Sequence, residues 1–408
     1  MAQVIISNNS GLSSYTPTAG DTVLFATNTT FDASLIPDTI TKVSNITLGE
    51  YGTGALPLFD GGVNYSGATL TVEPTTGTIW SKTFAHIHYG NVTEDGTALN
   101  FVTWQAGWGA DKIAMDSAMP AGSFTNDYAN KTLYIKPYGG TPVGKTYKFS
   151  ESYAGFANTT TPATNITIKN LSISNISVGG ISLLYCSNVH IDNVQGDMIG
   201  GQWSPGSLFY YGDFIGIANG CSNVKVENCG VTRVFDGAYT AQTFSTNAHI
   251  NDVQFLNNTA DSCGMFGVSI AIATSFLNTT LKNITVDGLV ATNIGKNCWG
   301  GNRGGHVIDS AVTAPLDKSK YMENIVFKNI TGTNAIRLIR KGGSYSKEVF
   351  LNIYGTDVDT LVQDFGDGNN PCALYYNVTD NLARTPSGTS GWQLTPGLAL
   401  PTRTILSR

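Results

Sequence analysis

The chain has 408 residues, a formal net charge of −6 and only 13% charged residues. It contains no basic cluster, which argues against nucleic-acid binding. No apolar run approaches the roughly 20 residues of a membrane helix, so no membrane insertion is expected. The first residues show no signal-peptide pattern, as expected of a virion component or of a chain whose signal has been removed.

Residues 1–60 predict strands that cap the beginning of a longer β structure, because they combine short alternating runs with glycine turns. Residues 61–160 break this rhythm. Within them, segments 123–128 and 132–137 predict a hairpin with a polar turn. We expect residues 61–160 to form a β-rich lateral insertion or irregular first coils.

Residues 161–360 repeat one short pattern. It starts with Asn, Asp or Glu and continues with a β-branched residue, any residue and an apolar residue, as in Asn165-Ile166-Thr167-Ile168. Each copy alternates apolar and polar positions, which is the pattern of a half-buried strand. Successive copies are 23 to 41 residues apart. The copies begin at Asn165, Asn188, Asn223, Asp252, Asn283, Asn324 and Glu348.

These copies predict a parallel β-helix, because a half-buried strand covers its apolar face only by stacking on its neighbours. Asn tolerates left-handed backbone geometry, and stacked Asn side chains can bond to one another. Cys186 and Cys221 each lie two residues before the Asn of a copy, which indicates an internal stack. The six Cys show no metal-ligand spacing, so buried free thiols are expected. Residues 361–408 leave the pattern and predict a C-terminal cap or tail.

Three segments carry a resemblance to known proteins: 20–25 (GDTVLF), 46–54 (ITLGEYGTG) and 130–135 (NKTLYI). They are similar to right-handed, single-stranded parallel β-helix proteins that act on polysaccharides, and most like bacteriophage tailspike depolymerases. The resemblance spans residues 15–355. It implies a homotrimer on a virion tail or outside the cell, which cleaves a bacterial capsule or lipopolysaccharide glycan.

Three acidic residues are expected to lie one coil apart along one edge of a sheet. Asp213, Asp236 and Asp261 each lie at or just before a strand that precedes a copy of the pattern. Carboxylates on adjacent coils would be about 5 Å apart, and those on alternate coils about 10 Å. The first spacing suits a retaining glycosidase and the second an inverting one. A hydrogen-bonded turn is the alternative role for each Asp.

A second candidate site combines an aromatic ring, a guanidinium, an imidazole and a carboxylate with four glycines in one segment. An arginine can clamp a uronate, a sialate-like carboxylate or a sulfate, and a histidine can act as acid or base near neutral pH. The alternative is a long turn in which the histidine is hydrogen-bonded locally. The residues are Trp299, Arg303, His306 and Asp309.

This segment resembles the Gly-His-Gly and Arg-x-Lys elements of polygalacturonase-like β-helix hydrolases, with Arg340 and Lys341 downstream. It departs from them in having neither a paired Asp-Asp nor a strict Arg-x-Lys. Further substrate contacts are expected from aromatic rings that suit sugar stacking and from one arginine. They are Trp203, Tyr210, Tyr211, Tyr239 and Arg337.

No cofactor or metal is expected. His86 and His88 lack partners at zinc-ligand spacing. The oxygen-rich segment 364–369 lacks the bidentate Glu of a calcium loop.

The sequence therefore predicts a depolymerase that hydrolyses a bacterial surface polysaccharide. Asp213 and Asp236 would be acid and base or nucleophile, and Asp261 could replace either. Two alternatives stay open. One is a lyase that uses His306 or Tyr239 as base and Arg303 to neutralise a uronate. The other is a non-catalytic glycan-binding fibre.

Overall fold

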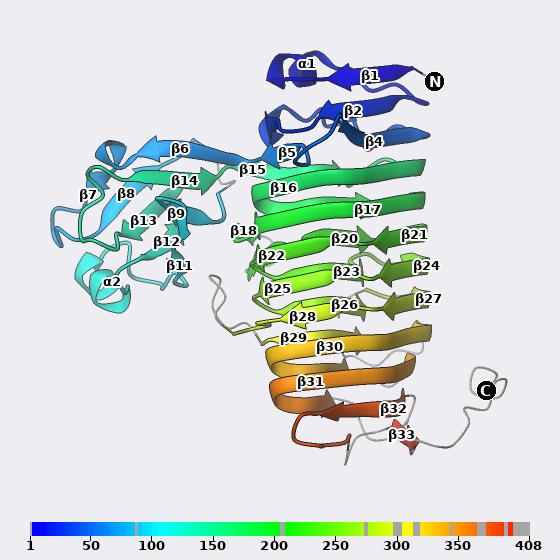
Figure 1. Cartoon of the computed structure of the whole chain (residues 1–408). Helices are drawn as coiled ribbons and strands as arrows, with labels where there is room; N and C mark the ends of the chain where they lie inside the picture. Colours follow the sequence, from blue (N-terminus) through cyan, green and yellow to red (C-terminus); the bar gives the residue numbers. More distant parts are fainter. Residues whose placement is uncertain are drawn as a thin grey trace.

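The computed structural model describes residues 2–85, 89–204, 209–272, 276–296, 304–312, 319–342, 346–364, 373–386 and 391–394. Most of these residues form a right-handed parallel β-helix, a column of stacked coils (Figure 1). The registers show that a full coil contributes one strand to each of three faces. The predicted fold is thereby confirmed. None of the helices among the described residues is both long and apolar enough to cross a membrane.

The three faces are named here in the order in which the chain visits them. The first face contains β1 (Gln3–Ile6), β2 (Thr22–Ala26), β4 (Ile46–Tyr51), β21 (Ser222–Glu227), β24 (His249–Leu256), β27 (Thr279–Asp287) and β33 (Gly391–Leu394). The second contains β3 (Thr30–Asp32), β5 (Leu58–Asp60), β22 (Gly230–Val234), β25 (Thr259–Cys263) and β28 (Val290–Thr292). The third contains β15 (Ser152–Asn158), β20 (Ile215–Ala218), β23 (Gly237–Thr243), β26 (Phe266–Ile272) and β29 (His306–Val312).

Some strands continue around the corners of the column and so belong to two or three faces. They are β16 (Ala163–Leu184), β17 (Cys186–Ile199), β30 (Lys320–Gly342), β31 (Ser346–Asp364) and β32 (Ala373–Asp380). The short helix α1 (Asn9–Ser14) and a 3₁₀ turn at Ala33–Leu35 accompany the first coils.

The corners of the column are made by residues with left-handed backbone geometry, most of them Asn. Asn283, for example, has a φ of 54° and donates a hydrogen bond to Asp252 of the preceding coil at 2.9 Å. It accepts one from Asn324 of the next coil, also at 2.9 Å. Equivalent bonds join Asn188 to Asn165 at 3.0 Å and Asn223 to Asn188 at 2.8 Å. The predicted stacking of the Asn positions is confirmed.

The seventh copy of the pattern begins at residue 347, one residue earlier than the sequence predicted. Glu348 pairs with Ile325, so the residue aligned with Asn324 is Lys347 and Glu348 occupies an inward, core position. Inside the column Glu348 accepts a hydrogen bond from Ser310, and its carboxylate lies 4.0 Å from the ammonium of Lys341. Side chains of both charged residues are fully buried.

A lateral module, residues 61–150, leaves the column after β5 and returns at β15 (Figure 1). A four-stranded sheet contains β6 (Gly62–Ser66), β9 (Val92–Glu94), β10 (Thr97–Ala98) and β14 (Thr146–Ser150). A five-stranded sheet contains β7 (Thr71–Val72), β8 (Trp80–Thr83), β11 (Asn100–Phe101), β12 (Ser123–Asp127) and β13 (Thr132–Lys136). Helix α2 (Lys112–Ala118) and a 3₁₀ turn at Gly67–Thr69 complete the module.

The antiparallel pairing of β12 with β13 confirms the predicted hairpin. The module is anchored to the column, because its apolar core includes Met198 and Phe235 of the coils. Asn91 strengthens this junction by donating a hydrogen bond to the carbonyl of Met198 at 2.7 Å. The module therefore flanks the edge at which the third face begins.

The four described cysteines, Cys186, Cys221, Cys229 and Cys263, are buried free thiols, as predicted. Cys186 and Cys221 contact each other inside adjacent coils, where the backbone N–H of Cys186 lies 3.4 Å from the Cys221 sulfur. The hydrogen bond between the two thiols, together with burial, raises the pKa of Cys186. These thiols belong to the core and offer no reactive sulfur to solvent.

Candidate active site

A cleft of about 620 Å³ crosses the third face of the column. This volume is within the ordinary range of small-molecule sites. The floor runs over β16, β20, β23, β26 and β29, which are successive neighbours in the sheet. An extended glycan could therefore lie across the coils. Three carboxylates line the cleft, those of Asp213, Asp236 and Asp309.

Asp213 lies just before β20 and is half-buried. Its carboxylate accepts a hydrogen bond from the backbone N–H of Gly237 at 3.2 Å. The hydroxyl of Thr240 also donates to it, at 3.4 Å. Both donors belong to the next coil, and hydrogen bonds of this kind stabilise the ionised form of a carboxyl group.

Asp236 immediately precedes β23, so it is the direct chain neighbour of the Gly237 amide that binds Asp213. It is only 9% exposed. Its backbone is fixed by bonds from its N–H to Gly212 at 3.2 Å and from Met265 to its carbonyl at 2.8 Å. The structure therefore brings Asp213 and Asp236 together on adjacent coils, as expected from the sequence.

Asp309, on β29, lines the same cleft two coils beyond β23 and is 4% exposed. Ser269 donates a hydrogen bond to its carboxylate at 2.9 Å, and Arg340 contacts the other oxygen at 3.2 Å. Gln242 in turn donates to the Ser269 hydroxyl at 2.9 Å. Burial raises the pKa of Asp309, and this effect outweighs the lowering by Arg340 and Ser269. The carboxyl group of Asp309 on the cleft floor therefore holds its proton more strongly than a solvent-exposed Asp does.

His306 does not have the environment expected of an acid or base near neutral pH. It is 4% exposed, and burial, together with the charges of Arg340 and Arg337, lowers its pKa to about 3. The imidazole is therefore neutral at physiological pH and cannot hold an acidic sugar by its charge. Arg337, expected to contact substrate, instead donates a hydrogen bond to the backbone carbonyl of Gly304. Neither residue is among those that line the cleft.

Asp261 is not brought to the cleft. It lies on β25 of the second face, where its neighbours in register are Thr232 and Thr292. Its carboxylate accepts hydrogen bonds from Thr292 at 2.6 Å and from Asn293 at 2.7 Å. These are the bonds of a corner ladder, so the expectation of three carboxylates along one edge is wrong for this residue.

Tyr239 lies in the core of the column and is fully buried. Its hydroxyl lies 2.9 Å from the carbonyl oxygens of both Cys229 and Thr259, and these two acceptors share its proton. Burial raises its pKa well above the ordinary value. The structure therefore leaves no access for Tyr239 to act as a base or to stack on a sugar.

Aromatic side chains at the cleft come partly from positions that the sequence did not single out. Tyr211, which was expected, lines the cleft beside Tyr153 of β15, and burial and a hydrogen bond with Tyr153 raise the pKa of Tyr211. Phe244, just after β23, is 49% exposed and also lines the cleft. Exposed rings at such a site suit stacking on a sugar. No periodic signal marks Tyr153 or Phe244.

Other expected contacts cannot be placed. Trp203 lies on β18 (Gln202–Ser204) and Tyr210 on β19 (Phe209–Tyr211), but their side chains fall outside the described part of the chain. Trp299 and Arg303 also lie outside the described residues, as do His86 and His88. The role of each stays a prediction.

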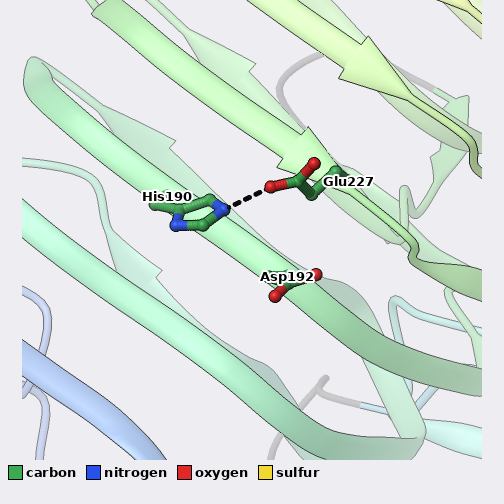
Figure 2. Close-up of side chains that lie close together, drawn as sticks. All are labelled: His190, Asp192 and Glu227. Atoms are coloured by element: carbon green, nitrogen blue, oxygen red, sulfur yellow. Dashed lines mark hydrogen bonds and ion pairs between the residues drawn. The ribbon is translucent and has the colours of Figure 1, made fainter.

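One group of described side chains has the composition of a metal site. Figure 2 shows His190 and Asp192 of β17 beside Glu227 of β21, with ligand atoms within 4.8 Å of one another. Glu227 already accepts from His190 at 2.8 Å and from Lys225 at 2.6 Å, which lower its pKa. A divalent cation would have to displace Lys225. The group lies on the first face, away from the strands of the cleft, and we assign it no role in the site.

The fold and the cleft together define a parallel β-helix with an acidic and partly apolar groove across one face. No protein-family model matches the chain, and no curated protein matches its sequence. Solved structures resemble it at low identity. A GH136 lacto-N-biosidase from Eubacterium ramulus is 11% identical, with a TM-score of 0.49, over 97% of this chain and 67% of that chain.

A family 28 exopolygalacturonase from Yersinia enterocolitica is 12% identical, with a TM-score of 0.36, over 96% of this chain and 78% of that one. The tailspike protein of E. coli bacteriophage HK620, solved with a pentasaccharide, is 8% identical, with a TM-score of 0.37, over 93% and 58%. These likenesses concern the fold alone. The function of this chain has to be inferred from the residues of its own cleft.

Proposed function

We propose that the chain is a glycoside hydrolase whose cleft on the third face binds and cleaves a polysaccharide. The observation that carries this proposal is the meeting of three carboxylates, Asp213, Asp236 and Asp309, in one cleft with exposed aromatic rings. Glycoside hydrolysis needs a pair of carboxyl groups of different protonation state on the two sides of the scissile bond.

Asp213 and Asp236 are the proposed catalytic pair. Asp213 is half-buried and accepts two hydrogen bonds, which suits the ionised base or nucleophile. Asp236 is nearly buried and adjoins the Gly237 amide that binds Asp213, so we take it as the partner that protonates the leaving oxygen. Asp309 lies farther along the floor, where its raised pKa and its bond to Ser269 suit a contact to sugar hydroxyls.

The lyase alternative receives less support. Its expected bases were His306, whose pKa is about 3, and Tyr239, which is sealed in the core. Neither position therefore offers the base that β-elimination of a uronate requires. The non-catalytic fibre is distinguished from the hydrolase only by experiment.

We also propose that the substrate is a polysaccharide of a bacterial cell surface, and that the protein acts as a homotrimer on a virion tail or outside the cell. This part rests on the sequence resemblance. A solution mass of a single chain would contradict the trimer.

The reaction class is tested by digesting a panel of capsular and lipopolysaccharide glycans in ¹⁸O-labelled water. Hydrolysis adds one water across the broken bond, so new reducing ends carrying ¹⁸O are expected. Unsaturated products without the label would establish a lyase instead. A glycan that is bound but stays intact would establish a fibre.

A further inference from the structure

A second hollow, of about 250 Å³, adjoins the cleft at the beginning of the third face. It lies between β15 and the segment 33–38, and it shares one lining residue with the cleft, Tyr153. Tyr153 is 45% exposed and forms a hydrogen bond with Tyr211 of the cleft. The two hollows therefore meet at this ring, and the smaller one is called the distal pocket here.

Buried hydrogen bonds fix the wall of the distal pocket that faces away from the cleft. Thr41, which follows the 3₁₀ turn at Ala33–Leu35, donates to the carbonyl of Ala157 on β15 at 2.6 Å. Asn158 of β15 donates to the carbonyl of Thr41 at 2.9 Å. Thr41 and Asn158 are both fully buried. The pocket is thus a built feature of the fold, and the exposed residue Asp38 and the ring of Tyr153 give it the polar and aromatic groups that suit a sugar.

The distal pocket and the cleft share one floor. A single row of residues in register crosses the third face, one from each successive strand. The row begins in the distal pocket and ends at the far end of the cleft. Its members are Ala157, Ser182, Gly216, Thr240, Ser269 and Asp309.

The proposed catalytic pair lies in the middle of this row. Thr240, a central member, donates a hydrogen bond to Asp213, and Asp236 precedes the strand that carries Thr240. β15 and β16 lie on one side of the pair, and β26 and β29 lie on the other. Adjacent coils are about 4.8 Å apart, which is close to the length of one sugar ring, so a chain of about five sugars would span the row. A bond held at the pair would therefore be an internal bond of that chain.

We infer that the distal pocket is a subsite for a sugar of the same glycan chain, and that the protein cuts bonds inside the chain rather than at its end. The inference rests on the proposed function, because it takes Asp213 and Asp236 as the cleaving pair. It deepens that function by giving the distal pocket a ligand and by predicting where the chain is cut. Each cut adds one water across a glycosidic bond.

Binding is measured with fragments of capsular and lipopolysaccharide glycans, prepared by partial acid hydrolysis and separated by length. The full chain carries Asp236→Asn in this assay, so that the fragments stay intact. Affinity should rise with length up to about five sugars and then level off. Adding Asp38→Trp, which places a large ring in the distal pocket, should lower the affinity for the longest fragments about tenfold, as the loss of one or two hydrogen bonds does. Fragments of two or three sugars should bind as before.

Thr39→Trp is the matched control, because Thr39 is the next residue, is also exposed and does not line the distal pocket. It should leave the dependence on length unchanged. The cutting pattern is measured with the parent on a glycan that it cleaves. Early products should cover many lengths, and the mean length of the polymer should fall before the shortest products accumulate.

Different results separate the parts of the inference. If Asp38→Trp bound every fraction as Thr39→Trp does, the distal pocket would be no subsite, while the catalytic pair would be untouched. A single short product that accumulates from the start, with the polymer keeping its length, would show cutting at the chain end. If Asp38→Trp removed the dependence on length but the parent cut no glycan, the subsite would stand and the hydrolase proposal would fail together with the cutting pattern. Absence of binding by every fraction would overturn both proposals.

Discussion

At the scale of single residues, His306 couples the stability of the fold to pH. Burial and two arginines lower its pKa to about 3, so the folded state favours the neutral imidazole. Its contribution to stability is complete above the unfolded pKa of about 6.5 and is lost as the pH falls from there to about 3.

His306→Asn should therefore flatten this part of the pH dependence. Between pH 7 and pH 4, the free energy of unfolding of the parent should fall by roughly 2–4 kcal/mol more than that of the variant. Urea unfolding of both proteins at the two pH values measures the difference. If the free energies of unfolding of the parent and the variant fell equally between the two pH values, the pKa of His306 in the folded protein would not be lowered.

Lys341 and Glu348 form a charged pair inside the apolar column, 4.0 Å apart and fully buried. Removing Lys341 breaks this buried ion pair and deprives Glu348 of a charged partner, which costs about 3–5 kcal/mol. Lys341→Met alone should destabilise the protein by that amount, and Lys341→Met with Glu348→Gln should recover much of it. Denaturant midpoints of the three proteins check this, and equal losses in both variants would contradict the pairing.

At the scale of the repeated element, the left-handed corner and its side-chain ladder determine where the chain turns from one face to the next. Asn283 combines a φ of 54° with ladder bonds on both sides. Asn283→Ala loses these bonds and forces Ala into a left-handed conformation, at an expected cost of about 2–3 kcal/mol. Asn283→Gly loses only the bonds and should cost about 1 kcal/mol. Equal unfolding midpoints for the two variants would show that the backbone conformation contributes nothing.

The corners also explain which parts of the site could be predicted from sequence. The Asn pattern marks the corner at which the chain enters the first face, so the coils and their inward residues follow from periodicity. The corner between the second and third faces is less regular, because Arg233, Ser262 and Asn293 take the left-handed position in successive coils. Asp236 lies three residues after that corner and reaches the third face, whereas Asp261 lies just before it and stays on the second.

Strand parity accounts for the misplacement of Tyr239. It is in register with Val268 and Ile308, both inward, while its neighbour Thr240 is in register with Ser269 and Asp309 at the floor of the cleft. A shift of one residue exchanges core for surface. The same shift moved Glu348 from the ladder into the core. Registers of this kind are determined by loop lengths that the sequence pattern alone does not provide.

At the scale of the whole molecule, the column provides a rigid floor and the lateral module joins it at the corner that precedes the third face (Figure 1). Asp213, Asp236 and Asp309 lie far apart in sequence, and the coiling of the chain brings them to one cleft. The central claim is that Asp213 and Asp236 act there as a catalytic pair on a glycan.

The most direct measurement is the rate of reducing-end formation, on a glycan that the parent cleaves, by Asp213→Asn, Asp236→Asn and Asp261→Asn. Each of the first two should lower the rate by a factor of roughly 10² or more, because general acid–base catalysis contributes about that much. Asp261→Asn is the matched control, since Asn is an ordinary ladder residue, and it should retain the parental rate. Parental rates in Asp213→Asn and Asp236→Asn, with bound glycan unchanged, would contradict the account.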